Sequence, residues 1–220
     1  MKSKKIPLIE YLKYFREVSV VVIGVAVTLA ASHYLTKKNE KRDIHLYLNA
    51  IKIELEENVN VLDSAILYFT SESSYSSYLI QNDIDSLDAD SLIHYSSTFF
   101  IDRKFSLKMN AFEMFKTSGI MRLLEDKELM QSLWKIYGDI SLQTEVFEWY
   151  FHLKWADLQK EISVLDKKSM KDEKLMKPTI LASRPLYNFY TIGITYSMLN
   201  NCNETLKETQ EAIEKLEKTI

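Results

Sequence analysis

The sequence predicts an all-α protein with one N-terminal transmembrane helix, followed by an extramembrane antiparallel helical bundle with long helices. Glycine and proline are rare, with four and three in 220 residues, and neither occurs between Gly24 and Gly119. β-Sandwiches, barrels and glycine-rich nucleotide-binding folds need such residues at frequent turns and are therefore poor candidates. An apolar run lies near the N-terminus, and apolar residues recur at helical spacing beyond it.

The apolar run extends from Val18 to Leu35, without Asp, Glu, Lys or Arg. At about 1.5 Å per residue it covers roughly 27 Å, close to the roughly 30 Å hydrocarbon core of a bilayer. Basic residues bracket the run, and Tyr14 and Tyr34 stand where an interfacial aromatic belt would lie. We expect a short basic N-terminal segment over residues 1–17, a transmembrane helix over 18–36 and a helical extramembrane domain over 37–220.

Two other interpretations of the apolar run stay open. A buried helix of a soluble protein is equally apolar, although it seldom carries basic clusters at both ends. A cleaved secretory signal would fit the small residues Ala30, Ala31 and Ser32 near the end of the run. Against cleavage, Glu17 interrupts the basic-then-apolar order that is usual in such signals.

Two separate stretches carry a resemblance to a known family. The first is Tyr11-Leu12-Lys13-Tyr14-Phe15 followed by Glu17-Val18-Ser19-Val20-Val21-Val22-Ile23-Gly24-Val25. The second is Asn110-Ala111-Phe112-Glu113-Met114-Phe115-Lys116-Thr117-Ser118-Gly119, followed by Leu123, Leu124, Asp126, Lys127, Glu128 and Leu129. Together they resemble a family of uncharacterised single-pass membrane proteins common in Bacteroidota-type bacteria. The chain departs from that family at Ser32-His33-Tyr34, where the family has Asn-Asn-Trp.

The resemblance covers roughly residues 8–140; it implies a membrane anchor and brings no known activity. Lysine and arginine are balanced on the two sides of the apolar run, so the positive-inside rule does not orient the chain. A short tail, one span and a long following domain are the usual layout of a signal anchor. This layout predicts a bacterial inner-membrane protein with a cytoplasmic N-terminus and a periplasmic C-terminal domain.

Beyond the run, apolar residues spaced by three and four predict long helices. The first such stripe can continue directly from the anchor and consists of Ile44, Leu48, Ile51, Leu55, Val59, Leu62, Ile66 and Phe69. Residues 70–91 are rich in Ser and Asp and predict a loop with a short helix. A helix is expected over 110–118, with Gly119 in the left-handed conformation past its end.

Asp126 is a good N-cap for a helix that extends from Lys127 to about Lys168. Residues 167–185 are basic and predict a connection, and Pro185 suits the first turn of a helix that continues to the C-terminus. A seven-residue repeat in that last helix predicts packing within a four-helix-like bundle. One line of the repeat is Ile192, Leu199, Leu206, Ile213 and Ile220, and a line offset by three is Cys202, Thr209 and Leu216.

The sequence offers little support for catalysis, a cofactor or a metal centre. It contains no phosphate-cradling glycine loop, and its histidines form no HExxH or Glu-x-x-His motif; they are His33, His45, His94 and His152. Glu148 and His152 are four residues apart, but such a pair supplies only two metal ligands. Glu54, Glu56 and Glu57 are expected on a solvated face.

Two surfaces are candidates for contacts with proteins. Small side chains form one flank of the apolar run, along which another membrane helix can approach closely; they are Gly24, Thr28, Ala31 and Ser32. Trp149 and Trp155 are candidates for a partner surface, although aromatic residues at helical spacing are more often core. Residues 43–220 carry a net charge of about −9, which disfavours nucleic acid.

These features predict a membrane-anchored helical interaction protein without catalytic activity, in the bacterial envelope. Its partners are the lipid bilayer and either another membrane protein, of which it is an accessory subunit, or a second copy of itself. Two alternatives stay open: a sensor-like bundle that binds a small ligand between its helices, and an enzyme with an unrecognised site.

Overall fold

The computed structural model describes residues 8–100 and 103–220. These residues form seven α-helices and three short 3-10 helices with no strand among them, which confirms the all-α prediction. The α-helices are α1 (Leu8–Gln81), α2 (Ala89–Phe99), α3 (Asn110–Thr117), α4 (Lys127–Ser163), α5 (Glu173–Leu181), α6 (Arg184–Thr191) and α7 (Ile194–Thr219). The 3-10 helices are Ile84–Ser86, Ile120–Leu123 and Ser169–Lys171.

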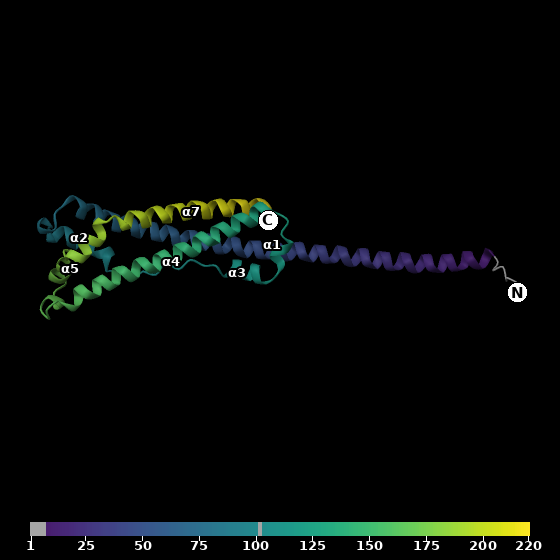
Figure 1. Cartoon of the computed structure of the whole chain (residues 1–220), viewed down its shortest axis with the longest axis horizontal. Helices are drawn as coiled ribbons and strands as arrows, with labels where there is room; N and C mark the ends of the chain where they lie inside the picture. The colour runs from purple at the N-terminus through teal and green to yellow at the C-terminus, as the bar shows by residue number, and fades with distance from the viewer. Residues whose placement is uncertain (1–7, 101–102) are drawn as a thin grey trace.

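Helix α1 is unbroken over 74 residues, a length of about 110 Å. Its N-terminal half projects from the rest of the molecule, and its C-terminal half lies in the bundle (Figure 1). Over Lys13–Gln81 the helix is long and apolar enough to cross a membrane, and its apolar 18-residue window has a mean hydropathy of 2.0 with none of it buried. Residues 1–7 of the predicted basic segment lie outside the described residues.

The bundle core forms between α1, α4 and α7. Helix α7 packs closely against both α1 and α4, and its C-terminus ends beside the point where α1 enters the bundle (Figure 1). Helices α1 and α4 meet through large aromatic side chains, as where Phe69 stacks on Phe147 with ring centroids 6.0 Å apart. Most of the predicted stripe of α1 is confirmed as core, because Leu48, Ile51, Leu55, Leu62 and Phe69 are each at most 1% exposed. The other three residues are half-buried; they are Ile44, Val59 and Ile66.

Short helices pack at the two ends of this core. Helix α3 lies near the end where α1 enters, and α2 and α5 lie at the far end (Figure 1). There the Tyr75 hydroxyl donates to the carbonyl of Leu181 at 2.8 Å, and the Ser76 hydroxyl donates to that of Tyr190 at 2.6 Å. These bonds attach α5 and α6 to the last turns of α1.

The loop predicted over residues 70–91 is wrong for its first part, because α1 continues to Gln81. Tyr75 and Leu79 are buried in this stretch. The hydroxyls of Ser74 and Ser77 donate to backbone carbonyls four residues earlier, which satisfies them within the helix. Tertiary burial therefore overrides the weak helix propensity of serine.

The C-terminal third also differs from the prediction. The expected connection over 167–185 contains α5, and the single helix expected after it is divided into α6 and α7 at Gly193, whose φ is 79°. Pro185 does lie in the first turn of α6. Helix α4 ends at Ser163, before the predicted boundary near Lys168.

The seven-residue repeat of the last helix faces the core through its second line. Cys202, Thr209 and Leu216 are buried, whereas Ile192 and Ile220 are exposed. Leu199, Leu206 and Ile213 of the first line are only half-buried. The second line of α7 thus faces the core, and the aliphatic side chains of the first line flank that contact. Two local predictions are confirmed: Asp126 accepts the N–H of Leu129 at 2.9 Å, and Gly119 has a φ of 74°.

Candidate functional site

A lysine and a glutamate are buried together in the core of the bundle. Lys154 of α4 and Glu72 of α1 each have a side chain that is only 1% exposed, and Nζ lies 3.1 Å from Oε1. Isolated charges in a protein interior are costly unless they are paired and hydrogen-bonded. The surrounding side chains supply those bonds.

Three tyrosines complete this arrangement, which we call the ion-pair cluster: Tyr68, Glu72, Tyr150, Lys154 and Tyr190. Tyr150 and Tyr190 donate from their hydroxyls to Glu72 Oε2 at 3.0 and 2.5 Å. Lys154 donates to the Tyr68 hydroxyl at 2.6 Å, and its Nζ lies 4.4 Å from the centroid of the Phe99 ring. The cluster therefore joins α1, α4 and α6, and Lys154 also contacts α2 through Phe99.

Burial sets the protonation chemistry of the cluster. It lowers the pKa of the Lys154 ammonium, while the Glu72 carboxylate acts in the opposite direction. Burial raises the pKa of the Tyr150 and Tyr190 hydroxyls well above the ordinary value of 10.0, and the charge of Glu72 adds to this. The tyrosines are thus neutral donors to a carboxylate. A substrate has no access to side chains so deeply buried, so the cluster holds the helices together rather than reacting.

Sequence reasoning missed the ion-pair cluster, although a signal for it exists. Glu72 follows Phe69 by three residues, and Lys154 follows Phe151 by three and precedes Leu158 by four. Both charges therefore stand within the apolar stripes of their helices. A charge at such a position on two helices that pack together indicates a buried pair, because a lone one would be too costly.

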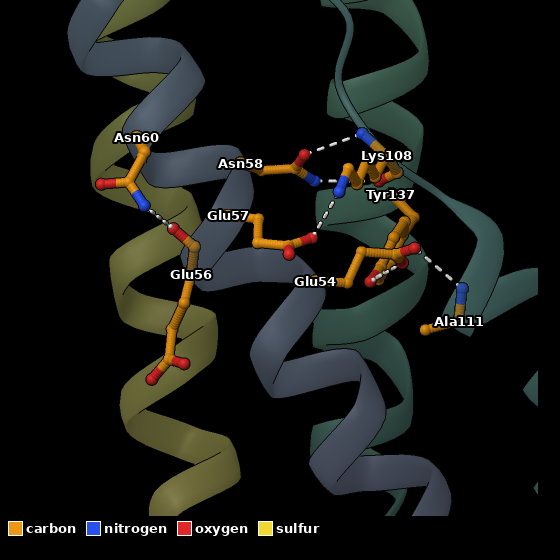
Figure 2. Close-up of polar contacts among 8 residues, drawn as sticks. All are labelled: Glu54, Glu56, Glu57, Asn58, Asn60, Lys108, Ala111 and Tyr137. Carbon is orange, nitrogen blue, oxygen red and sulfur yellow. Dashed lines mark hydrogen bonds and ion pairs between the residues drawn. The ribbon is translucent and has the colours of Figure 1, made fainter.

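A second polar contact attaches α3 to α1 (Figure 2). The Glu54 carboxylate, on a residue 5% exposed, accepts the Ala111 N–H at 2.8 Å and the Tyr137 hydroxyl at 2.7 Å. It thereby satisfies an N–H of the first turn of α3, which has no partner within the helix. The Asn58 side chain accepts the N–H of Lys108 at 2.7 Å and donates to its carbonyl at 2.9 Å.

The acidic residues expected on a solvated face are thus divided. Glu56 and Glu57 are exposed as expected, and Glu57 pairs with the Lys108 ammonium at 2.8 Å (Figure 2). Glu54 is not, because it points toward the N-terminus of α3. Burial, followed by the hydrogen bond and charge of Glu54, raises the pKa of Tyr137 far above its ordinary value.

We expect Glu54→Ala to lower the free energy of unfolding by about 2–3 kcal/mol, because hydrogen bonds to a charged group are lost and a buried hydroxyl keeps no partner. Glu56→Ala is the matched control, because Glu56 lies two residues further along α1 and is exposed. It should change the free energy of unfolding by less than about 0.5 kcal/mol. Urea denaturation measures both values. Hydrogen exchange should also show faster exchange of the Ala111 amide in the Glu54 variant. Equal destabilisation by the two substitutions would contradict the capping role of Glu54.

An apolar groove lies between α1 and α3, with a volume of about 830 Å³. Leu46, Ile53 and Met114 line it and are 62%, 57% and 61% exposed. Soluble proteins seldom leave adjacent large apolar side chains uncovered unless they serve an interaction. We call this feature the apolar groove.

The small residues singled out in the apolar run lie on the same side of α1 as the apolar groove. Gly24, Thr28, Ala31 and Ser32 are all exposed, and the Thr28 hydroxyl donates to the Gly24 carbonyl at 2.8 Å. Leu46 follows Thr28 by 18 residues, which is five helical turns. One face of α1 therefore carries Gly24, Thr28, Ser32, Leu46 and Ile53, and we call it the outer face.

The two tryptophans do not share a surface. Trp149 is exposed, whereas Trp155 is half-buried and lines a separate cleft together with Glu148 and His152. Their separation of six residues places them on different sides of α4. Within the described part of the chain, no group of three or more His, Cys, Asp or Glu side chains is placed to hold a metal ion.

No protein-family model, no curated protein and no solved structure matches the chain.

Proposed function

We propose that the chain is a single-pass membrane protein of the bacterial envelope, an interaction protein without catalytic activity, which binds a second membrane-anchored chain along the outer face of α1. The observation that carries this proposal is the continuity of that face. One unbroken helix bears small residues in its apolar run and exposed apolar residues beside the bundle.

Lipid accounts for the apolar run. Its valines and leucines are all exposed and have no cover from the bundle; Val20, Val21 and Leu29 are each 65% exposed. Exposure of such a surface to water along a whole helix would be strongly unfavourable, whereas hydrocarbon removes that cost. The signal-anchor layout then favours a cytoplasmic N-terminus and a periplasmic bundle.

Lipid does not account for the apolar groove. Leu46 follows Leu35 by eleven residues, or about 16 Å of helix, which is more than the interfacial layer outside the hydrocarbon core. Leu46 and Ile53 therefore stand in the aqueous compartment. Their exposure is explained by a protein partner that leaves the membrane alongside α1.

A second copy of this chain is the partner that we favour. The partner must have a helix that continues without interruption from the bilayer past the groove. Helix α1 of a second copy is such a helix. Two copies related by a twofold axis along α1 bring their outer faces together over the span and the groove. Arg42 lies near this face and is paired with Asp43 at 3.2 Å, so the two copies do not meet as unpaired like charges.

Cysteine crosslinking in native membranes tests the proposal. We expect Leu46→Cys and Ile53→Cys each to form a disulfide-linked dimer under mild oxidation. Asp63→Cys is the control, since it is exposed on another side of α1 and should remain monomeric. The native Cys202 adds no background, because it is buried and burial raises the pKa of its thiol to about 12.

Three outcomes distinguish the alternatives. A crosslinked species of another mass at Leu46→Cys and Ile53→Cys would identify a different membrane protein in place of a second copy. Absence of any crosslink at both positions would contradict docking along the outer face. Release of the chain from membranes by alkaline carbonate would contradict the anchor itself.

A further inference from the structure

A cleft with a volume of about 610 Å³ lies between the extended segment 103–106 and one side of α4. This volume is within the range of small-molecule sites in proteins, roughly 300–1,000 Å³. The cleft shares no lining residue with the apolar groove. An inference drawn from it is therefore independent of the proposed dimer.

The floor of the cleft is aromatic and held in place. Phe105 and Phe147 are buried, with ring centroids 5.4 Å apart, and Phe151 lies 5.9 Å from Phe105. Tyr68 contacts Phe105 from the inner side at 5.7 Å and is bonded there to Lys154 of the ion-pair cluster. The floor is consequently preformed, so a ligand does not need to order it.

The segment that forms one wall is also anchored. The two hydrogen bonds between Asn58 and Lys108 fix the backbone close to its end (Figure 2). Phe105 fixes its centre by inserting among the rings of the floor. The basic side chains on this segment are thus attached to a rigid support at the rim of the cleft.

The rim has an excess of positive charge. Arg103 and Lys104 are exposed, and neither forms an ion pair with another described residue. Among the lining residues the one carboxylate belongs to Glu148, which lies on the opposite wall with His152. An arginine and a lysine beside an aromatic floor suit an anionic group joined to a planar apolar body.

We propose that this cleft binds a small organic anion with an aromatic body, whose carboxylate or sulfonate contacts Arg103 and Lys104 while its ring lies on Phe105 and Phe151. Such a ligand is dissolved in the aqueous compartment and is not part of the bilayer. Segment 103–106 lies beside Asn60, which is 25 residues, or about 40 Å of helix, past Leu35. The headgroups of the anchoring membrane do not reach that far.

Three probes that share one ring system test the charge and ring requirements. The full-length chain in lipid nanodiscs is titrated calorimetrically with naphthalene-2-sulfonate, neutral 2-naphthalenemethanol and cationic 2-naphthylmethylamine, with empty nanodiscs as reference. We expect the sulfonate to bind about tenfold or more tightly than the alcohol, and the amine more weakly than both. Equal affinities, or sulfonate binding weaker than about 1 mM, would overturn the proposal.

Variants assign the binding to this cleft. The double substitution Arg103→Ala and Lys104→Ala should weaken sulfonate binding about tenfold and leave the alcohol unchanged. Thr144→Trp, which fills the cleft from the α4 side, should remove binding of both. Lys167→Ala with Lys168→Ala removes two exposed charges elsewhere and should have no effect. An unchanged sulfonate affinity in the Arg103 and Lys104 variant would overturn the assignment.

Discussion

Replacing Lys154 with methionine is expected to lower the free energy of unfolding by about 3–5 kcal/mol, the range found when one partner of a buried ion pair is removed. Methionine fills nearly the same volume, so packing is largely kept. The loss arises because Glu72 stays buried with its charge and loses the ammonium 3.1 Å away. The Tyr68 hydroxyl also loses the hydrogen bond that it accepts from the Lys154 ammonium.

A second substitution separates charge from packing. Adding Glu72→Gln to the Lys154→Met chain removes the uncompensated carboxylate and still offers an acceptor to Tyr150 or Tyr190. We expect this double variant to recover most of the stability, since a neutral core of similar shape is often as stable as the buried pair. The difference between the single and double variants measures the coupling between the two charges.

Urea denaturation followed by tryptophan fluorescence measures these changes, because Trp134, Trp149 and Trp155 all lie on α4. Lys160→Met is the matched control on the same helix. Lys160 is exposed and pairs with Asp157, so its replacement should change stability by less than about 1 kcal/mol. The role of the ion-pair cluster would be contradicted if Lys154→Met were no more destabilising than Lys160→Met.

Alkaline pH is expected to unfold the bundle. Burial raises the pKa of four tyrosine hydroxyls above their ordinary value of 10.0; they are Tyr75, Tyr137, Tyr150 and Tyr190. Above pH 10 the unfolded chain releases these protons while the folded chain retains them. The folded state then binds more protons, so the free energy of unfolding falls as pH rises, by about 1.4 kcal/mol per pH unit for each tyrosine.

Four such groups give a limiting slope of about 5 kcal/mol per pH unit. Cys202 acts in the same direction between its ordinary pKa of 9.0 and its folded value of about 12. Lys154 acts in the opposite direction, because its pKa is lowered in the folded state. Between the lowered pKa of Lys154 in the folded state and its ordinary pKa of 10.5, the unfolded chain binds one more proton than the folded chain. Over this pH range Lys154 therefore makes the free energy of unfolding rise with pH.

Urea midpoints measured from pH 8 to pH 12 test the alkaline prediction. Tyr75→Phe removes one of the four groups and loses a single hydrogen bond, to the Leu181 carbonyl. We expect its slope above pH 10 to be shallower than that of the unsubstituted chain by about 1.4 kcal/mol per pH unit. Parallel curves for the two chains would show that Tyr75 titrates alike in the folded and unfolded states.

Much of the helical architecture follows from local signals. The stripe from Leu48 to Phe69 repeats with the helical period, and most of it is buried in the bundle, with Val59 and Ile66 half-buried. The Asp126 cap and the Gly119 stop are equally local, since one turn of helix contains both partners. The helical conformation of residues 70–81 was not predicted, because it depends on contacts with α5 and α6. The break at Gly193 between α6 and α7 was not predicted either.

The candidate sites were less accessible to such reasoning. Gly24, Thr28 and Ser32 are recognisable as a flank of one helix, but their alignment with Leu46 and Ile53 becomes visible only when α1 is known to be unbroken. Trp149 and Trp155 lie on two different sides of α4 and do not form one surface. Glu54 resembles its exposed neighbours in sequence, and only the position of α3 distinguishes it (Figure 2).

The amino-acid order alone determined that this chain is helical, where its apolar run lies and which face of α1 enters the core, because these depend on periodicity within a few turns. The tertiary structure decided which charges are buried, that Glu72 meets Lys154 across 82 residues of chain, and that segment 103–106 forms a cleft with α4. The physical reason is that the cost of burying a charge depends on partners from distant helices, which no local pattern specifies.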